Sequence, residues 1–420
     1  MTTEPDVDDA LTHLARNDAG RVVAIVARRF GDLDLAEDAV QDALVEAGER
    51  WPTSGVPDNQ AAWLHQVARR KAIDRLRRAD AAVRRERRAH DGRDGDGDAA
   101  DPMPLLTDQG FDPGDERLRL ILLCCHPALD PDAQVALTLR LVGGLTTDEI
   151  AAAFLVPTST LAQRISRAKR KIRDAAIPLS VPEQLEERLG VVLDTLYLIF
   201  NEGYLSRGAN APATRVDLCA EAIRLADVVV GLSDRRPEAC GLLALMWFVH
   251  ARRDARVVDG SLVLLDQQDR TRWYVDEVQR ANSLLHEAMG ARRPGPFQLQ
   301  AIIAAHHANA RTPDDTDWGR INALYDQLAQ MRPSPVVDVN RAVAVAMVHG
   351  PTAGLQVLEG IDGLDQYHLF HATRSELLRR TGRVDEAETA RTTAHALATN
   401  PAERRLLARR HAPEVQGLDR

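Results

Sequence analysis

The sequence predicts an all-α protein, and three observations support this prediction. Apolar residues recur at intervals of three and four along most of the chain, the spacing that gives a helix one buried face. Alternating apolar and polar runs, which are typical of strands, are scarce. Aromatic residues make up only 4% of the 420 residues, whereas Ala, Leu, Arg and Asp are abundant. At ~100–200 residues per domain, a chain of this length is expected to form two to four domains.

The charges are unevenly distributed, although the net charge is −9. Residues 69–88 contain ten arginines and lysines against three acids, and residues 164–173 contain six cations and no acid. The first 60 residues contain thirteen acids and five bases. Two basic patches beside an acidic segment favour two contacts with nucleic acid and one with a protein.

The chain opens with acidic and polar residues, and no stretch approaches the ~18–20 apolar residues that span a bilayer. We therefore expect a cytoplasmic protein with no membrane partner. The cysteines Cys124, Cys125, Cys219 and Cys240 lack zinc-ligand or CxxC spacing, so no disulfide framework is expected. Cys124 and Cys125 precede His126, which leaves a metal or redox role open. The favoured interpretation is two small buried side chains at a helix end.

Several helices are expected within the first 90 residues. One contains the apolar residues of 22–30 and ends at Gly31 and Asp32. The next spans residues 35–50 and is expected to expose one acidic side, formed by Glu37, Asp38, Gln41, Asp42 and Glu46. After a loop at residues 52–59, another helix spans residues 60–78. Its expected inward residues recur every four positions and are Leu64, Ala68, Ala72 and Leu76.

Residues 90–115 differ sharply from what precedes them. They are rich in Gly, Asp and Pro and show no sustained periodicity. Such a composition predicts a flexible, self-repelling acidic linker. Helices are expected again at residues 116–125 and 133–141.

Residues 145–172, LTTDEIAAAFLVPTSTLAQRISRAKRKI, predict two helices separated by a tight turn. Thr146 and Glu149 have the spacing of a capping box, which satisfies two free backbone N–H groups at a helix start. Pro157 interrupts the pattern because it has no N–H to donate. The second helix is expected to turn four apolar residues inward, and these are Leu161, Ile165, Ala168 and Ile172.

The opposite face of this second helix carries hydroxyls, an amide and cations. Its residues are Ser159, Thr160, Gln163, Arg164, Arg167, Arg170 and Lys171. Arg pairs with guanine, Gln pairs with adenine, and flanking cations contact phosphates, so the pair of helices is interpreted as a DNA-reading helix-turn-helix. A helical hairpin with one solvated basic face is the alternative.

The second half of the chain is expected to be a continuous series of helices. Their ranges are 184–201, 215–232, 236–252, 274–289, 296–310, 318–331, 336–349, 352–358, 366–381 and 384–397. The last two have the spacing of a tetratricopeptide (TPR) unit, with Gly382 between them, Ala387 and Ala394 at the crossing, and Pro401 after them. Stacked helix pairs form a curved surface suited to a peptide or protein ligand.

Other polar clusters are given structural interpretations. His306 and His307 point about 100° apart on a helix, so they are expected in the core or at a cap rather than on one metal. Asn201, Glu202 and Tyr204 could form a ligand site, or a helix end capped by left-handed Gly203. Residues 257–265 suit a short β-hairpin or a loop insertion, with 266–270 as its solvated edge. No Walker A, HExxH, GxSxG or GxGxxG motif occurs, so we expect no catalytic residues, metal or cofactor.

Several segments resemble bacterial sigma factors of the extracytoplasmic-function (ECF) type, within the sigma-70 family. DLAEDAVQDALVEAGERW (34–51) with AAWLHQVARRKAIDRLRR (61–78) resembles their region 2, and residues 145–172 resemble their region 4. The segment at 124–151 is similar to a subgroup with a C-terminal TPR-like extension. LYLIFNEGYLSRG (196–208) and LLDQQDRTRW (264–273) also resemble that subgroup.

This resemblance implies a domain order: a region 2 domain at 1–89, the linker at 90–115, a region 4 helix-turn-helix domain at 116–178, and a TPR-like regulatory domain at 183–420. Region 4 would read the −35 element through the outward residues of its second helix. Region 2 would contact the −10 element and opened DNA strands through Arg69, Arg70, Lys71, Arg75, Arg77 and Arg78. It would bind core RNA polymerase through Asp38, Gln41, Asp42 and Glu46. The implied partners are core RNA polymerase, promoter DNA and a peptide or protein ligand of the TPR-like domain.

Two other functions remain open from the sequence. One is a stand-alone helix-turn-helix regulator with a TPR-like sensor, which would need neither a polymerase-binding surface nor a strand-opening patch in residues 20–90. The other is a TPR scaffold that has lost DNA binding, which would not need Arg164, Arg167 and Lys171 on one helix face.

Overall fold

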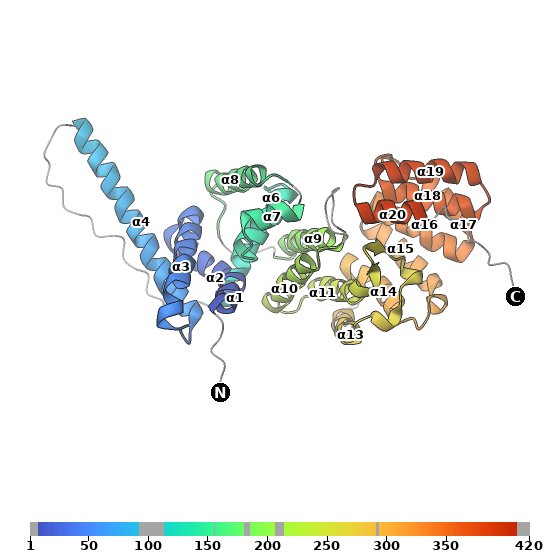
Figure 1. Cartoon of the computed structure of the whole chain (residues 1–420), viewed down its shortest axis with the longest axis horizontal. Coiled ribbons are helices and arrows are strands. Elements are labelled where there is room, and N and C mark those ends of the chain that lie inside the picture. The colour runs from blue at the N-terminus through green and yellow to red at the C-terminus, as the bar shows by residue number, and fades with distance from the viewer. Residues whose placement is uncertain are drawn as a thin grey trace. The chain divides into compact units, whose positions relative to one another are not determined.

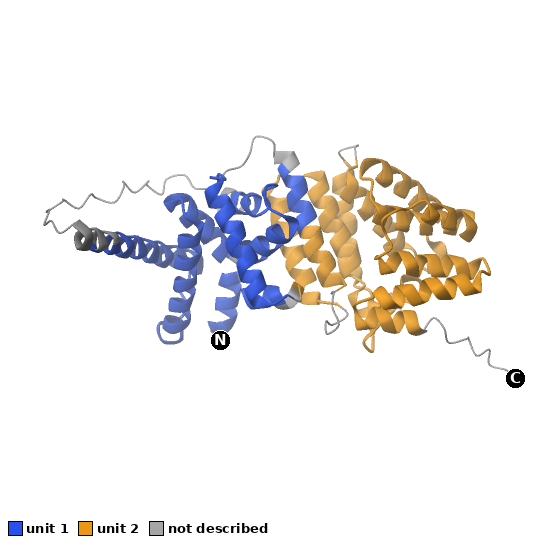
Figure 2. Ribbon diagram, turned by 90° about the horizontal axis from the view of Figure 1, so that it is seen from above, with its two compact units in different colours: residues 1–152, 156–195 blue, residues 153–155, 196–420 orange. Residues whose placement is uncertain are grey.

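The computed structural model describes residues 7–91, 113–154, 156–179, 185–205, 214–290 and 294–409. These residues are almost entirely helical, which confirms the predicted all-α class (Figure 1). The chain divides into two compact units (Figure 2). Unit 1 contains residues 1–152 and 156–195, and unit 2 contains the remainder. The predicted linker at 90–115 lies largely outside the described residues.

Unit 1 begins with four helices, α1 (Val7–Asn17), α2 (Ala19–Phe30), α3 (Leu33–Ser54) and α4 (Gln60–Asp91). Gly31 ends α2 in the left-handed conformation (φ 69°), and the Asp32 carboxylate caps α3 by accepting the Leu35 N–H at 3.0 Å. Asn59 caps α4 in the same way, through the Ala62 N–H. The boundaries of α2, α3 and α4 therefore coincide with capping residues.

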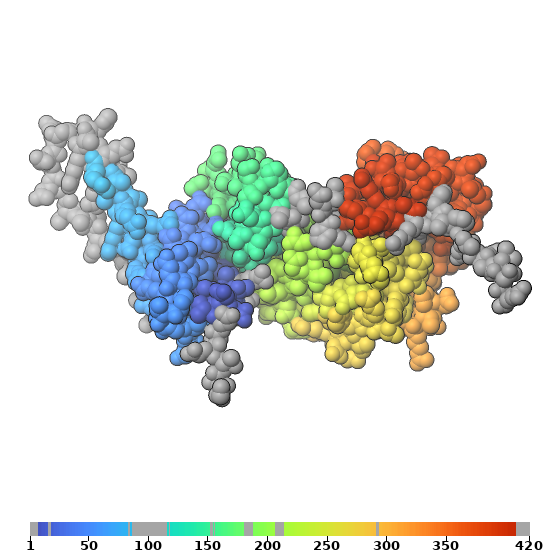
Figure 3. Space-filling view, viewed as in Figure 1, coloured from blue at the N-terminus to red at the C-terminus, as the bar shows by residue number. Residues whose placement is uncertain are grey.

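Three details of this helical group differ from the sequence expectations. Pro52 lies in the last turn of α3, so the loop before α4 is shorter than expected. Leu76 is 41% exposed, because the outer part of α4 extends past the helices that cover its first half (Figure 3). Glu37 and Glu46, expected on the exposed side of α3, are each only 8% exposed. Their burial follows from partners elsewhere in unit 1.

The second half of unit 1 contains α5 (Pro113–Cys124), α6 (Pro131–Leu137), a π-helical turn η1 (Thr138–Val142), α7 (Thr147–Phe154) and α8 (Thr158–Asp174). It packs directly on the first half. Gly20 of α2 lies so close to η1 that an added Cβ would stand 2.6 Å from the Leu141 carbonyl oxygen. Only glycine permits this approach.

Helix α9 (Leu185–Tyr204) crosses from unit 1 into unit 2 at Thr195. Its first half belongs to the core of unit 1, where Leu189 and Val192 are buried. Arg188 donates to the Leu122 carbonyl oxygen at 2.6 Å. A boundary at residue 183 would therefore cut the core of unit 1.

Unit 2 continues with helices and one small hairpin. The helices up to the hairpin are α10 (Val216–Leu232), α11 (Pro237–His250) and α12 (Arg253–Arg256). The hairpin pairs β1 (Val257–Val258) with β2 (Ser261–Leu262), antiparallel, through Asp259 and Gly260, which both have positive φ. This confirms the predicted hairpin, because a two-residue Asp-Gly turn matches the twist of paired strands. Two short 3₁₀ turns, η2 (Leu265–Gln267) and η3 (Arg270–Arg272), follow.

The remaining helices are α13 (Val275–Met289), α14 (Pro296–Asn309), α15 (Trp318–Met331), α16 (Pro335–His349), α17 (Pro351–Glu359), α18 (His368–Arg380), α19 (Val384–Leu397) and α20 (Pro401–Arg409), with a 3₁₀ turn η4 (Pro313–Asp315) before α15. Helices α16, α18 and α20 begin at a constant spacing of 33 residues. Gly382 has φ 77° between α18 and α19, and Ala387 and Ala394 are buried, as expected. Paired helices of about 34 residues are the repeat of TPR proteins.

Candidate nucleic-acid and protein interfaces

The helix-turn-helix of α7 and α8 forms as the sequence predicts. The capping box is present: the Thr146 hydroxyl accepts the Glu149 N–H at 3.2 Å, and the Glu149 carboxylate accepts the Thr146 N–H at 2.7 Å. Pro157 directly precedes α8. The four predicted inward residues of α8 are all buried, and they are Leu161, Ile165, Ala168 and Ile172. The opposite face of α8 therefore points outward.

Most of the predicted DNA-reading residues lie exposed on that outward face. The exposed ones are Ser159, Thr160, Gln163, Arg167, Arg170 and Lys171. Arg164 is half-buried, and its guanidinium lies 3.1 Å from the carboxylate of Asp132 in α6. The Lys171 ammonium donates to the Ala128 carbonyl oxygen. A partly exposed pair such as Arg164–Asp132 contributes only about 1 kcal/mol or less, so Arg164 can leave it for a stronger partner.

The six basic residues predicted on α4 divide into two groups. Arg70 and Lys71 bind Glu46 at 2.8 and 2.7 Å, and Arg75 binds both Asp38 and Asp42, at 2.6 and 2.8 Å. These cations are engaged by α3 and cannot all be free for phosphates. Arg77 and Arg78 are exposed and make no ion pair within the described residues, while Arg69 is half-buried.

The residues predicted to bind polymerase likewise fall into a buried group and a solvent-accessible group. Hydrogen bonds from Lys71 and Arg70 lower the pKa of the buried Glu46 carboxyl, so Glu46 fixes α3 against α4 and is not a contact surface. Asp38 and Gln41 are exposed, and Asp42 is half-buried. The outward stripe of α3 continues at i+7 and i+11 from Asp38 through Val45 and Glu49, and Val45 is 61% exposed. Sequence reasoning missed both Val45 and Glu49.

A basic hollow of about 490 Å³ lies where α4 meets the end of α3. Its lining includes Trp63 beside the cations Arg50, Arg69, Arg70 and Arg77. Trp63 packs edge-on against buried Trp51, with ring centroids 5.4 Å apart, and this contact holds the indole in place. An aromatic ring among cations is the arrangement that binds unstacked bases and their phosphates.

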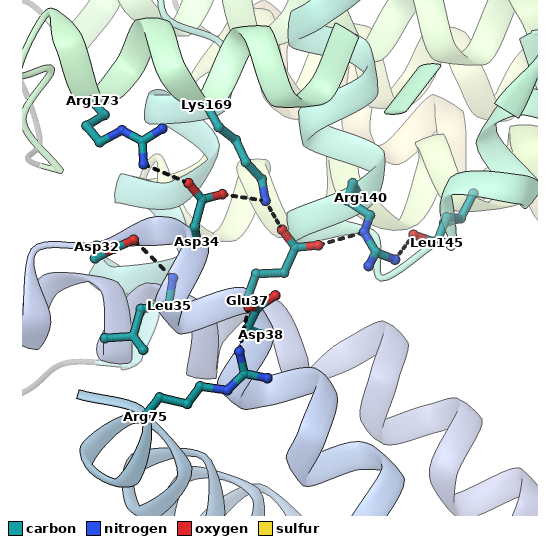
Figure 4. Close-up of polar contacts among 10 residues, drawn as sticks. All are labelled: Asp32, Asp34, Leu35, Glu37, Asp38, Arg75, Arg140, Leu145, Lys169 and Arg173. Carbon is teal, nitrogen blue, oxygen red and sulfur yellow. Dashed lines mark hydrogen bonds and ion pairs between the residues drawn. The ribbon is translucent and has the colours of Figure 1, made fainter. Parts of the chain in front are cut away.

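An ion-pair cluster joins α3 to η1 and α8, and its members Glu37, Arg140 and Lys169 are largely buried (Figure 4). Glu37 accepts a hydrogen bond from Arg140 at 2.7 Å and pairs with Lys169, and Asp34 pairs with Lys169 at 3.0 Å and with Arg173 at 3.2 Å. Burial alone would lower the pKa of Lys169, but the two carboxylates outweigh it and raise the pKa. The two halves of unit 1 are thus held together by charge as well as by packing.

The cysteines and histidines do not form a reactive site. All four cysteines are free and buried, and burial raises the pKa of the Cys124 thiol well above its ordinary value. Burial lowers the pKa of His307 to about 4, and its ring packs edge-on against Trp318. No group of three or more metal-binding side chains occurs within the described ranges. None of the helices there is long and apolar enough to cross a membrane.

The structure also corrects the expectation that Gly203 ends a helix in the left-handed conformation. It is not a left-handed cap, because α9 continues through Tyr204 and Gly203 is absent from the glycines with positive φ. An added Cβ would stand 2.8 Å from both the backbone nitrogen and the sulfur of Cys219. The glycine allows α10 to approach α9 closely.

Comparisons with known proteins match this architecture. Sigma-70 region 2 matches residues 14–82, and sigma-70 region 4 matches residues 119–172. A family of unknown function, DUF6596, matches residues 188–289. An uncharacterised protein of Rhizobium meliloti is 42% identical over 390 residues, covering 91% of this chain and 90% of that protein.

Two mycobacterial relatives match the first part of the chain. The ECF RNA polymerase sigma factor SigK of Mycobacterium ulcerans is 30% identical over 173 residues, which are 40% of this chain and 85% of SigK. The probable ECF RNA polymerase sigma factor SigI of Mycobacterium tuberculosis is 33% identical over 164 residues, which are 38% of this chain and 53% of SigI.

The region 2 match carries more weight than the helix-turn-helix, because a stand-alone regulator or a scaffold would not need it. It coincides with α2, α3 and α4, where the exposed stripe, the basic hollow and the free cations lie. Sigma factors are non-catalytic subunits, whose partners are core RNA polymerase and promoter DNA. The chain therefore belongs to the ECF sigma factors of the sigma-70 family.

Proposed function

We propose that this sigma factor directs promoter-specific transcription initiation in the cytoplasm. Helix α8 reads the −35 element, α4 and the basic hollow hold the opened −10 strand, and the outward stripe of α3 binds core polymerase. The observation that carries the proposal is the exposed polar and cationic face of α8 in the same unit as the Trp63 hollow. Unit 2 contains the TPR-like helix pairs and is called the TPR-like unit below. We further propose that it regulates, within the same chain, the sigma domains of unit 1, and that it binds a peptide or protein ligand.

Replacing Arg164 with Ala is expected to relax the base preference at one or two −35 positions. An Arg that is bidentate to guanine contributes ~1–3 kcal/mol of discrimination, whereas a phosphate contact weakens all sequences alike. Lys171→Ala should therefore lower affinity uniformly and flatten the salt dependence. Selection of a promoter library with each variant measures both effects.

The matched control is Asp132→Ala, which releases Arg164 from its 3.1 Å partner without removing it. This variant should keep the wild-type preference. If Arg164→Ala merely weakens binding and leaves the preference intact, Arg164 contacts phosphate and α8 reads the bases with other residues.

Neutralising Arg77 and Arg78 is expected to impair strand opening more than duplex binding. Both side chains are exposed on α4, and Arg77 lines the hollow. Each phosphate contact on a single strand contributes ~0.7 to the salt slope. The double Ala variant should lose ~1.4 from the slope for a −10 single strand. Filter binding across salt concentrations gives the slope, and permanganate reactivity of unpaired thymines reports opening.

Arg75→Ala is the comparison variant, because Arg75 is bound to Asp38 and Asp42. It should lower thermal stability and leave the salt slope nearly unchanged. Equal loss of opening and duplex binding in the Arg77 and Arg78 variant would refute their assignment.

Removing the TPR-like unit is expected to change promoter-dependent transcription at constant sigma concentration. The truncation should end at Asn201, because Leu189, Val192 and Thr195 of α9 belong to the core of unit 1. A truncation at Pro182 removes them and serves as the comparison, which should be less stable. Identical transcription and polymerase binding by the full chain and the chain ending at Asn201 would argue against regulation in cis.

A further inference from the structure

Unit 2 contains a cavity of about 520 Å³, open to solvent on one side, that no promoter-binding role explains. It is lined by the end of α9, by α12, by the hairpin and the segment after it, and by α16, α18 and α20. Two sequence motifs without an assigned role meet here, since Tyr204 belongs to FNEGY and Gln268 to DQQDR. Most of the remaining wall is aliphatic, including Leu262, Leu264 and Leu406.

Arg256 is the most unusual residue of this cavity. It is only 8% exposed, and no carboxylate of the described residues lies within ion-pair distance of it. Its guanidinium lies over the Tyr204 ring, 3.3 Å from the centroid. Its Nη1 atom is buried and has no hydrogen-bond partner. Neighbouring Arg252 donates to the Tyr204 hydroxyl.

The acids that line the cavity already have other partners. Glu403 accepts a hydrogen bond from His368 at 2.8 Å, and Glu376 binds Arg380 at 2.9 Å. Arg256 therefore brings a positive charge into a largely apolar wall, where the charge of Glu403 favours it without forming an ion pair with it. Burial lowers its pKa, yet a guanidinium stays protonated, so the cost of desolvation remains until an anion arrives.

Gln268 supplies a second unsatisfied group. Its side chain is 6% exposed, and its Nε2 donates to the Val263 carbonyl oxygen at 3.0 Å. Its Oε1 is buried without a donor. Buried polar atoms without partners are costly, and they mark sites that a ligand completes.

We propose that this cavity binds a small organic carboxylic acid with an apolar body and one hydrogen-bond donor. The carboxylate pairs with Arg256, the donor bonds to Gln268 Oε1, and the apolar body lies against the leucines. The cavity volume lies within the ~300–1,000 Å³ of small-molecule sites. The site is independent of promoter recognition, because all of its lining residues belong to unit 2.

The test measures binding of two probe pairs to the full-length chain by calorimetry and thermal shift. The acids are N-acetyl-L-phenylalanine and 3-hydroxydecanoate, and their neutral counterparts are the carboxamide and the methyl ester. Both acids carry a donor and an apolar group. We expect the acids to raise the thermal midpoint and to bind at least tenfold more tightly than the neutral compounds.

Arg256→Met and Gln268→Leu keep the side-chain volume and remove the unsatisfied group. Each should reduce affinity for the acids at least tenfold, while the unliganded midpoint stays equal or rises. Arg383→Met is the control, because Arg383 is exposed and paired with Glu386 at 2.6 Å, outside the cavity. It should bind the acids as the wild type does.

The proposal is overturned if neither acid binds the wild-type chain at millimolar concentration, or if the neutral compounds bind equally well. It is also overturned if Arg256→Met lowers the midpoint and keeps acid binding, since Arg256 would then only support Tyr204. Binding of an acidic peptide in place of both acids would assign the cavity to a protein ligand and reject the small-molecule proposal.

Discussion

Deleting residues 93–112 is expected to abolish promoter-dependent transcription, while the region 2 and region 4 halves of unit 1 each remain folded. The −35 and −10 elements lie about 85 Å apart along B-DNA at ~3.4 Å per base pair. The chain from Asp91 to Pro113 can reach ~75 Å when fully extended, and the deletion leaves it under ~10 Å. Region 2 and region 4 could then not reach both elements at once.

The packing within unit 1 sharpens this expectation. Gly20 against Leu141, and Glu37 and Asp34 against Lys169, hold the two halves in contact. With so short a connection, the two halves cannot exchange that contact for the spread arrangement on DNA. Open-complex formation on a consensus promoter and the thermal midpoint are the two measurements.

A Gly/Ser segment of equal length is the control for reach, and it should restore most of the activity because composition matters less than span. Substantial transcription from the deletion variant would show that the halves need not separate that far. Loss of activity with the Gly/Ser segment would instead assign a specific role to the acidic sequence.

Local features of the fold were predictable because each depends on neighbours in the sequence. The capping box at Thr146 and Glu149, the inward face of α8, and the Asp259-Gly260 hairpin need only spacing and turn chemistry. The last predicted helix pair, α18 and α19 with Gly382 between them, likewise needs only helical spacing and a turn residue. These predictions are confirmed.

The polar surfaces were less predictable, because a charge looks exposed until its partner is known. Glu37 meets Arg140 and Lys169, more than 100 positions further along the chain. Arg75 was assigned to DNA and Asp38 to polymerase, yet the two bind each other at 2.6 Å. Periodicity identifies which side of a helix is polar and does not reveal which cations and acids neutralise one another.

The exposure of Val45 on the outward stripe of α3 was equally hard to predict, because an apolar residue in a helical pattern is expected to be buried. Val45 is 61% exposed, between Gln41 and Glu49 on the same stripe. An apolar side chain held out by a rigid helix and flanked by polar residues offers a partner protein an apolar contact inside a polar rim. We infer that Val45 is the anchor for core polymerase.

Replacing Gln41 with Lys and Val45 with Glu is therefore expected to reduce affinity for core RNA polymerase by at least ~100-fold, or ~2.7 kcal/mol. The new charges would lose water in the complex without a prepared partner, whereas in the free protein they remain solvated, so stability should not change. Glu46 is left intact, because its bonds to Arg70 and Lys71 hold α3 on α4. A fluorescence titration of labelled sigma factor with core enzyme gives the affinity.

The matched control is Val384→Glu on α19, because Val384 is 66% exposed and undergoes the same chemical change in the other unit. It should bind core enzyme as tightly as the wild type, and both variants should keep the wild-type thermal midpoint. If the α3 variant binds normally, the outward stripe of α3 is not the polymerase contact. If both variants lose affinity equally, a glutamate in place of any exposed valine weakens association, and the position of Val45 has no special role.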